Sequence, residues 1–260
     1  MSQSLEAYIE RIRTSPVSDF YSSRWKSITD PTLLPTISRR DLIETPLSLR
    51  RYERRSGIVK VVWDASIPFL SEWSFTSIAE EELGLRAARP LIFLSDPHEA
   101  IEKAMWCYQH DMVPLVEERS SEVTLYAARK FRCDALITDP SSLPRVLPYL
   151  KGKSDPLSSM TIISDSFEPE VLLPYAHYAR KIDLVFSFPE TGALARAVLS
   201  EDPLFTVLPN CIVEYLDDYL VVTKNAPLTT PVIRYRTNIP AHCLKFSEGE
   251  GVIRDSSNRV

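Results

Sequence analysis

The stretch Lys181-Ile-Asp-Leu-Val-Phe-Ser-Phe-Pro-Glu-Thr-Gly-Ala-Leu-Ala195 begins with an apolar run and breaks into Ser, Pro, Glu and Thr before small residues follow. The pattern predicts a strand, a tight turn and then a helix. In an open parallel sheet, ligands bind at the carboxyl ends of strands, where helix N-termini present backbone N–H groups. Phe186 and Glu190 would therefore lie near a ligand. A structural alternative places Phe186 in the core and Glu190 in the first turn of the helix.

On either side of this stretch, apolar runs alternate with segments of helical periodicity. The expected strands are Ile58–Trp63, Leu91–Ser95, Met112–Val116, Ala135–Thr138, Thr161–Ser164 and Ile182–Phe186. The expected helices are Thr76–Leu83, Glu99–His110, Glu122–Phe131, Ser142–Leu150 and Pro169–Ala179. Such alternation produces right-handed βαβ units. The sequence therefore predicts an α/β fold with three layers, in which a mainly parallel sheet is flanked by helices.

The two ends of the chain have a different character. After Ser200 the expected elements are strands, at Leu204–Leu208, Ile212–Leu216, Tyr219–Thr223 and His242–Phe246, with Asp217-Asp218 as a hairpin turn. Before the α/β segment, Ser38 and Asp41 have the spacing of a helix capping box. We therefore expect a helical N-terminal wrap of the main domain over residues 1–55, an α/β core over 56–199 and a small C-terminal β-rich subdomain over 200–260.

Composition limits the classes of function. A chain of 260 residues with 44% hydrophobic and 25% charged residues fits a globular protein, and its net charge of -5 argues against a nucleic-acid partner. No apolar run approaches the roughly 20 residues that span a bilayer, and the N-terminus lacks the apolar core of a signal peptide. We therefore expect no membrane partner and a cytoplasmic location. The four cysteines form no CxxC pair, which argues against a zinc site.

Four segments occur in an order that points to a known family. They are Phe20-Tyr21 with Trp25, Leu34-Pro-Thr-Ile-Ser-Arg-Arg-Asp-Leu42, Phe186-Ser-Phe-Pro-Glu-Thr191, and Tyr219-Leu-Val-Val-Thr223 followed by Pro231-Val-Ile-Arg-Tyr-Arg-Thr237. The last segment is the most specific. In these segments the chain resembles the adenylate-forming superfamily, specifically the large N-terminal domain of phenylacetate–CoA ligase-like enzymes.

The resemblance implies a reaction and a set of site residues. Members use ATP to convert a carboxylic acid to an acyl-adenylate and usually pass the acyl group to coenzyme A. By this resemblance, Phe186 would stack on the adenine of ATP or AMP, and Glu190 would act in catalysis by holding magnesium against the phosphates. Ser187 and Thr191 lie in the same nucleotide-binding turn. Thr237 lies in the run that closes the nucleotide site. In the same run, Arg234 and Arg236 could lie near phosphates or brace the strand, and we favour bracing.

The chain departs from the family pattern in several places. The stretch Val61–Leu70 stands where the family has a glycine-rich phosphate loop, but it contains no glycine and carries Asp64 and Pro68. Ile239 occupies the position of the aspartate that binds ribose, and it cannot accept a hydrogen bond. In the turn, Ser187 replaces a glycine and Pro189 a Ser or Thr. The chain ends at Val260, so we expect the mobile C-terminal domain with its catalytic lysine to be absent.

Two hypotheses of function follow. The first is a divergent acyl- or aryl-CoA ligase-like protein with reduced catalysis, which binds a nucleotide or a small carboxylic acid and performs part of the ligase reaction with a separately encoded protein partner. The second is a non-catalytic binding or scaffold protein on the same fold. Asp96 and His98 also allow two interpretations: a proton-transfer pair, or a helix start with Asp96 as the N-cap and Pro97 at the first position.

Overall fold

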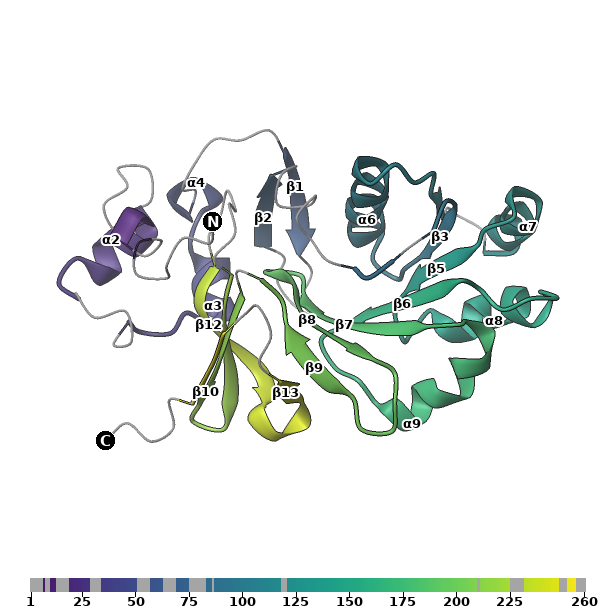
Figure 1. Ribbon diagram of the computed structural model, residues 1–260. Helices are drawn as coiled ribbons and strands as arrows, with labels where there is room; N and C mark the ends of the chain where they lie inside the picture. The colour runs from purple at the N-terminus through teal and green to yellow at the C-terminus, as the bar shows by residue number, and fades with distance from the viewer. Residues whose placement is uncertain are drawn as a thin grey trace. The chain divides into compact units, whose positions relative to one another are not determined.

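The computed structural model describes residues 7, 10–12, 19–28, 34–50, 57–62, 69–74, 83–85, 87–117, 121–209, 211–224, 232–247 and 252–255 (Figure 1). Contacts between residues divide the chain into two compact units. Unit 1 combines Met1–Ser77 with Val207–Val260, and unit 2 is Ile78–Thr206. The predicted domain boundaries after residues 55 and 199 stay predictions.

Unit 2 is built on a mainly parallel sheet. Its parallel strands are β3 (Pro90–Phe93), β4 (Leu115–Val116), β5 (Ala135–Thr138), β6 (Ser159–Ser164) and β7 (Ile182–Phe188), in the spatial order β4-β3-β5-β6-β7. The order continues with β8 (Gly192–Val198), which is antiparallel to β7, and then β9 (Leu204–Val207). The sheet confirms the predicted α/β class.

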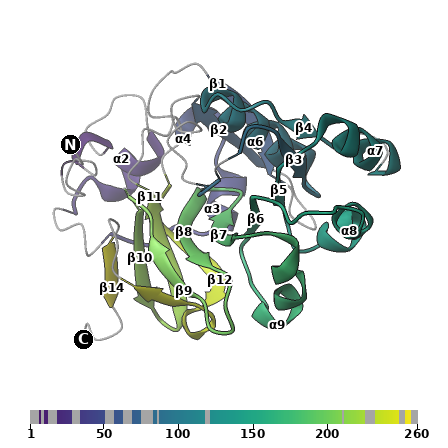
Figure 2. The ribbon, with the colours of Figure 1, turned by 45° about the vertical axis from the view of Figure 1, so that its right-hand side comes forward.

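Helices join the parallel strands. They are α6 (Pro97–Gln109), α7 (Ser121–Phe131), α8 (Leu143–Lys151) and α9 (Pro169–Leu172), the last followed by the 3-10 helix η2 (Leu173–Tyr178). Figure 2 shows α6, α7 and α8 flanking strands β3, β5 and β6. At the start of α6, the Asp96 carboxylate accepts a hydrogen bond of 2.8 Å from the His98 N–H, and Pro97 occupies the first position. The N-cap interpretation of Asp96 is therefore confirmed.

The segment after β7 corrects one prediction. Instead of a helix, residues 192–198 form β8, which pairs antiparallel with β7 from Phe188 and Gly192 outward. Gly192 has φ of 70°, a backbone angle that glycine adopts without steric cost and that turns the chain back on itself. Ala193, Leu194 and Ala195 are good helix formers, but here they are buried beside β7. Tertiary pairing therefore outweighs their local helix propensity.

Three further predictions are corrected. The predicted strand Ile58–Trp63 is β1 (Gly57–Val62), but it pairs antiparallel with β2 (Phe69–Ser74) in a separate two-stranded sheet, because a short connection permits a hairpin and not a helical crossover. The helix predicted over 169–179 divides into α9 and η2, since Pro174 has no N–H to continue the α-helical ladder. The strand predicted over 242–246 begins late, as β13 (Lys245–Ser247) after the 3-10 helix η3 (Ala241–Cys243). The predicted helix 76–83 lies almost entirely outside the described residues.

Unit 1 contains a four-stranded sheet. Strands β10 (Cys211–Leu216), β11 (Tyr219–Lys224) and β12 (Val232–Pro240) are antiparallel, and β14 (Val252–Asp255) adds to β10 in parallel. Between β10 and β11, Asp217 and Asp218 have φ of 49° and 63°, and such angles at both central residues are those of a type I′ hairpin turn. The predicted C-terminal β-rich region and its turn are confirmed.

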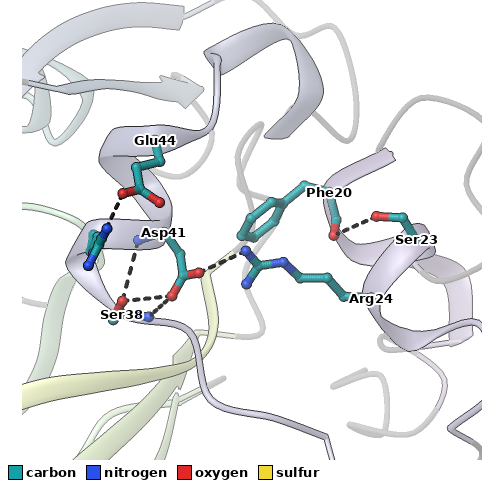
Figure 3. A network of polar contacts seen from close by, with 7 residues as sticks. Phe20, Ser23, Arg24, Ser38, Asp41 and Glu44 are labelled. Atoms are coloured by element: carbon teal, nitrogen blue, oxygen red, sulfur yellow. Dashed lines mark hydrogen bonds and ion pairs between the residues drawn. The ribbon is translucent and has the colours of Figure 1, made fainter.

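The N-terminal helices of unit 1 are α2 (Asp19–Trp25), α3 (Arg39–Glu44) and α4 (Leu47–Arg50). The chain before α3 contacts β12, because the backbone of Ile37 exchanges hydrogen bonds with Arg234 and Arg236. Figure 3 shows the predicted capping box at the start of α3. The Ser38 N–H donates to the Asp41 carboxylate over 2.7 Å, and the Asp41 N–H donates to the Ser38 hydroxyl over 3.3 Å.

Candidate ligand-binding site at the carboxyl edge of the parallel sheet

The strand order of unit 2 fixes where a crevice opens. Strand β3 lies between β4 and β5 in the sheet. The chain that leaves β3 therefore runs toward β4, whereas the chain that leaves β5 runs in the opposite direction, toward β6. In open α/β sheets, ligands bind outside the carboxyl ends of the strands at such a switch point. The loops after β3 and β5 therefore define the expected binding position.

A pocket of about 520 Å³ lies at this edge. Its lining residues come from the carboxyl ends of β3, β5, β6 and β7 and from the starts of α6 and α9: Ser95, Glu99, Asp139, Pro140, Ser141, Ile163, Ser164, Asp165, Ser166, Glu168, Val171, Leu172, Ser187 and Pro189. Its volume is in the usual range for small-molecule sites, roughly 300–1,000 Å³. The pocket is therefore the candidate site of unit 2.

Asp139 organises the floor of this pocket. Its carboxylate accepts hydrogen bonds from the Ser95 N–H over 2.6 Å and from the Ser142 N–H over 2.9 Å. It also accepts from the hydroxyls of Ser141 and Ser142 over 2.5 and 3.1 Å. These bonds join the end of β5 to the end of β3 and to the start of α8. Asp139 therefore has a structural role in holding the switch-point loops together.

Ser187 contributes a hydroxyl to the other side of the pocket. Its exposed fraction is 6%, and within the described residues its side chain has no hydrogen-bond partner. The neighbouring strand contributes Ser164, whose hydroxyl accepts a hydrogen bond of 3.1 Å from the Ser166 N–H. Ile163 and Leu172 are buried apolar lining residues. The pocket thus combines an apolar wall with hydroxyl groups.

The charged side chains among the described lining residues are all acidic. Glu99, Asp139, Asp165 and Glu168 supply four carboxyl groups, and none of the lining residues in the described part of the chain is lysine or arginine. Carboxylates are ionised at neutral pH. The described lining therefore offers no cationic side chain for the Lys or Arg hydrogen bonds by which proteins usually hold phosphate.

The residues predicted to bind a nucleotide lie in and beside β7. Phe186 is fully buried, with its ring centroid 5.1 Å from that of Phe188 and 6.3 Å from that of Phe205. Ser187 lines the pocket. Glu190 lies in the turn after β7 and is only 3% exposed. Thr191 is buried, and its hydroxyl donates to the Gly192 carbonyl over 3.2 Å. The roles of these residues toward adenine, phosphate and magnesium stay predictions.

Thr237 belongs to unit 1. Its hydroxyl donates to the Leu220 carbonyl over 2.9 Å and accepts from the Ile239 N–H over 3.1 Å, so it stabilises the edge of β12. Nearby in the same strand, Arg234 is buried, and its Nε donates to Glu214 over 3.2 Å. These contacts confirm that Arg234 braces the strand. A nucleotide-closing role for Thr237, and its proximity to Glu190, stay predictions.

Sequence reasoning missed part of the pocket. Asp139, Asp165 and Glu168 were not expected in a site, although Asp139 and Asp165 directly follow β5 and β6. A signal was available, because polar residues directly after buried parallel strands gather at one edge of the sheet. The sequence alone does not give the strand order, which decides which of these loops meet.

The described residues provide neither a metal-binding cluster nor a membrane-spanning helix. No group of three or more His, Cys, Asp or Glu side chains in that part of the chain could hold a metal ion. Among the helices described, none is both long and apolar enough to cross a membrane. The phosphate-loop position is only partly described, since Asp64 and Pro68 lie outside the described residues between β1 and β2.

Comparison with known proteins supports the fold. No protein-family model and no curated protein sequence matches the chain. Among solved structures, a variant of E. coli MenE with bound OSB-AMS has a TM-score of 0.51 and 12% sequence identity, covering 71% of this chain and 43% of that chain. The anthranilate CoA ligase AuaEII in complex with anthranoyl-AMP has a TM-score of 0.52 and 10% identity, covering 66% of this chain and 39% of that chain.

Wild-type E. coli MenE with a bound m phenylether-linked analogue of OSB-AMS is similar to the same degree, with a TM-score of 0.50 and 10% identity over 69% of this chain and 44% of that chain. The chain thus has the fold of adenylate-forming ligases and spans less than half the length of these structures. At this level of identity, the similarity establishes the fold alone.

Proposed function

We propose that this chain is a divergent adenylate-forming protein, similar to the acyl- and aryl-CoA ligases and specifically to the phenylacetate–CoA ligases, with reduced catalysis. The family reaction activates a carboxylic acid with ATP to an acyl-adenylate and then forms a coenzyme A thioester. The supporting observation is the pocket at the carboxyl edge of unit 2, which includes Ser187 and Pro189 from the segment that resembles the family. Its ligand would be a small molecule bound where the fold places ligands.

Nucleotide binding is proposed only in a weakened form. Phe186 would stack on adenine and Glu190 would hold magnesium, with Ser187, Thr191 and Thr237 completing the nucleotide site. Phe186 and Glu190 are buried, so each would have to become accessible before it could contact ATP or AMP. Magnesium and coenzyme A enter the proposal through the resemblance alone.

The charge of the pocket favours reduced catalysis. Two like charges 4 Å apart repel by about 1 kcal/mol in water and by about 4 kcal/mol at an effective dielectric constant of 20. A triphosphate beside Asp139, Asp165 and Glu168 would meet such repulsion, and no described lining residue is a cation that could offset it. The described residues of this pocket therefore do not fit the phosphates of ATP.

The same observation favours a second candidate, a non-catalytic binding or scaffold protein on this fold. Such a protein would keep the pocket for a small molecule without performing the ligase reaction, or would act through a protein partner. For either candidate, we propose that the protein works in the cytoplasm. The two candidates differ in whether the acid-activating step survives, and this step can be measured.

The test is ATP–pyrophosphate exchange with a panel of aliphatic and aromatic acids. We expect no exchange above background, in the parent chain or in the isosteric variant Glu190→Gln. Urea unfolding of both proteins serves as the control that the variant is folded. Robust exchange by the parent that disappears in Glu190→Gln would refute reduced catalysis and assign the predicted catalytic role to Glu190.

A thermal shift with Mg-ATP or AMP separates weak binding from none. A ligand at 100 times its dissociation constant stabilises the protein by about 2.7 kcal/mol. We expect a much smaller effect at millimolar nucleotide. If neither nucleotide shifts the transition, the binding or scaffold candidate is favoured over the ligase-like one.

A further inference from the structure

We infer that the pocket at the carboxyl edge of unit 2 selects a small organic cation, a protonated amine on an apolar skeleton, over a carboxylate or phosphate of similar size. The inference rests on the second candidate of the proposed function, a non-catalytic protein that keeps this pocket for a small molecule, and it names the chemical class of that ligand. It follows from three independent properties of the described lining: three carboxylates without a cationic partner, the hydroxyl of the largely buried Ser187, and an apolar wall.

Three of the lining carboxylates have no cationic partner among the described residues. In that part of the chain, Asp139 accepts hydrogen bonds from neutral donors, the N–H groups and hydroxyls of serines. Asp165 accepts only a hydrogen bond of 3.4 Å from the Ser166 hydroxyl. Glu168 makes no side-chain bond to the start of α9. Within the described residues, none of these three carboxylates forms an ion pair. A cationic ligand would therefore meet unpaired negative charge from three directions.

Ser187 supplies the specific contact. Its side chain lines the pocket although the residue is 94% buried, as its exposed fraction of 6% implies. A hydroxyl can donate one hydrogen bond and accept others, and within the described residues the Ser187 hydroxyl has no partner. An ammonium N–H from the ligand would satisfy the acceptor capacity of this hydroxyl. An anionic ligand could use only its single donor.

The apolar part of the lining sets the shape of the ligand. Ile163 and Leu172 are buried beneath the pocket, and Val171, Pro140 and Pro189 complete the apolar surface. Sites for small molecules characteristically combine such a wall with a few polar groups that fix the orientation. A volume of about 520 Å³ accommodates an aromatic ring with a short chain.

The test compares three probes that share a phenyl skeleton and differ in head-group charge: 2-phenylethylamine, 2-phenylethanol and phenylacetate. Calorimetric or ligand-detected NMR titrations at neutral pH and millimolar probe would give the affinities. We expect the amine to bind more tightly than the alcohol, and the alcohol more tightly than phenylacetate. Added salt should weaken only the amine, because salt screens its attraction to exposed carboxylates.

Substitutions in the pocket test which side chains cause the preference for the amine. Asp165 and Glu168 are exposed, so the double variant Asp165→Asn/Glu168→Gln removes charge without disturbing the core. Ion pairs near the surface change affinity by up to about fivefold each. For the two substitutions together, we expect the affinity for the amine to fall by roughly two- to 25-fold and the affinity for the alcohol to stay unchanged. Asp155→Asn, an exposed aspartate that lines a different pocket, is the matched control and should change neither. Ser187→Ala should weaken both the amine and the alcohol.

Three results would overturn the inference: phenylacetate binding as tightly as the amine, an unchanged amine affinity in the double variant, or no binding of the amine to the parent chain. A different measurement, ATP–pyrophosphate exchange, tests the proposed function. Acid-dependent ATP–pyrophosphate exchange by the parent would refute reduced catalysis, whereas the order of probe affinities is measured without ATP.

Discussion

Replacing Asp41 with alanine removes a carboxylate that accepts hydrogen bonds from both Ser38 and Arg24 at the start of α3 (Figure 3). Asp41 completes the capping box with Ser38, and its Oδ1 accepts from Arg24 over 2.7 Å. The variant keeps the Ser38 hydroxyl as the N-cap acceptor and loses the bond from the Ser38 N–H to the carboxylate, and a typical hydrogen bond contributes about 0.5–1.5 kcal/mol. The side chains of the Arg24–Asp41 pair are 37% and 27% exposed, so the pair adds only about 0.2–1 kcal/mol. We expect the free energy of unfolding to fall by about 1–2 kcal/mol.

The effect should depend on pH. Partial burial opposes ionisation of Asp41, but hydrogen bonds from Ser38 and Arg24 outweigh it and lower the pKa of the carboxyl below its usual value. Because the folded-state pKa is depressed, the carboxylate stabilises the fold above the unfolded pKa, which is about 3.9. This contribution is lost as pH falls through the folded pKa. The difference between parent and Asp41→Ala should therefore shrink in acid below roughly pH 4.

Urea unfolding at neutral and acid pH, monitored by tryptophan fluorescence, measures this difference. Glu44→Ala is the matched control on the same helix: it removes the ion pair with Arg40, whose side chains are 84% and 60% exposed, and should have no measurable effect. The reasoning is wrong if Asp41→Ala destabilises no more than Glu44→Ala, or if its effect is the same at both pH values.

Two other predictions concern the thiols and the β10–β11 turn. Burial raises the pKa of Cys107 to about 12 and that of Cys133 to about 11, whereas Cys243 is exposed. A thiol reagent should therefore label Cys243 first, and rapid labelling of Cys107 in peptide mass spectra would contradict this. Asp218→Gly should raise the free energy of unfolding by up to about 1 kcal/mol, because glycine adopts its φ of 63° without strain. A lower urea midpoint in Asp218→Gly would count against it.

The sequence predicted those elements whose signals are local. Strand β5 occupies the predicted residues Ala135–Thr138, and Ser38 and Asp96 begin helices with the expected caps. Strand β8 was mistaken for a helix because Ala193–Ala195 favour a helix locally, and only pairing with β7 decides otherwise. The pairing of β8 with β7 and the burial of its side chains are tertiary features, which local helix propensity does not contain.

The candidate site was predictable to a similar extent. The position of Ser187 at the end of a buried strand followed from the apolar run before it. Its meeting with Asp139 and Asp165 depends on the order β5-β6-β7 in space, which the pattern of each strand leaves open. Sequence reasoning thus named Ser187 at the edge of the sheet where the candidate pocket lies, but not the residues that β5 and β6 contribute.

The reversal of direction at β7 has a consequence for how unit 2 folds. Strands β7 and β8 are joined only by residues 189–191, whereas β6 and β7 are separated by α9 and η2. Closing a short loop costs less chain entropy than closing a long one, and hairpins form in about 1–10 μs. We therefore expect the β7–β8 hairpin to form early and to serve as the template on which β6, and then β5, can dock. The segment that carries Glu190 would be ordered before the pocket beside it exists.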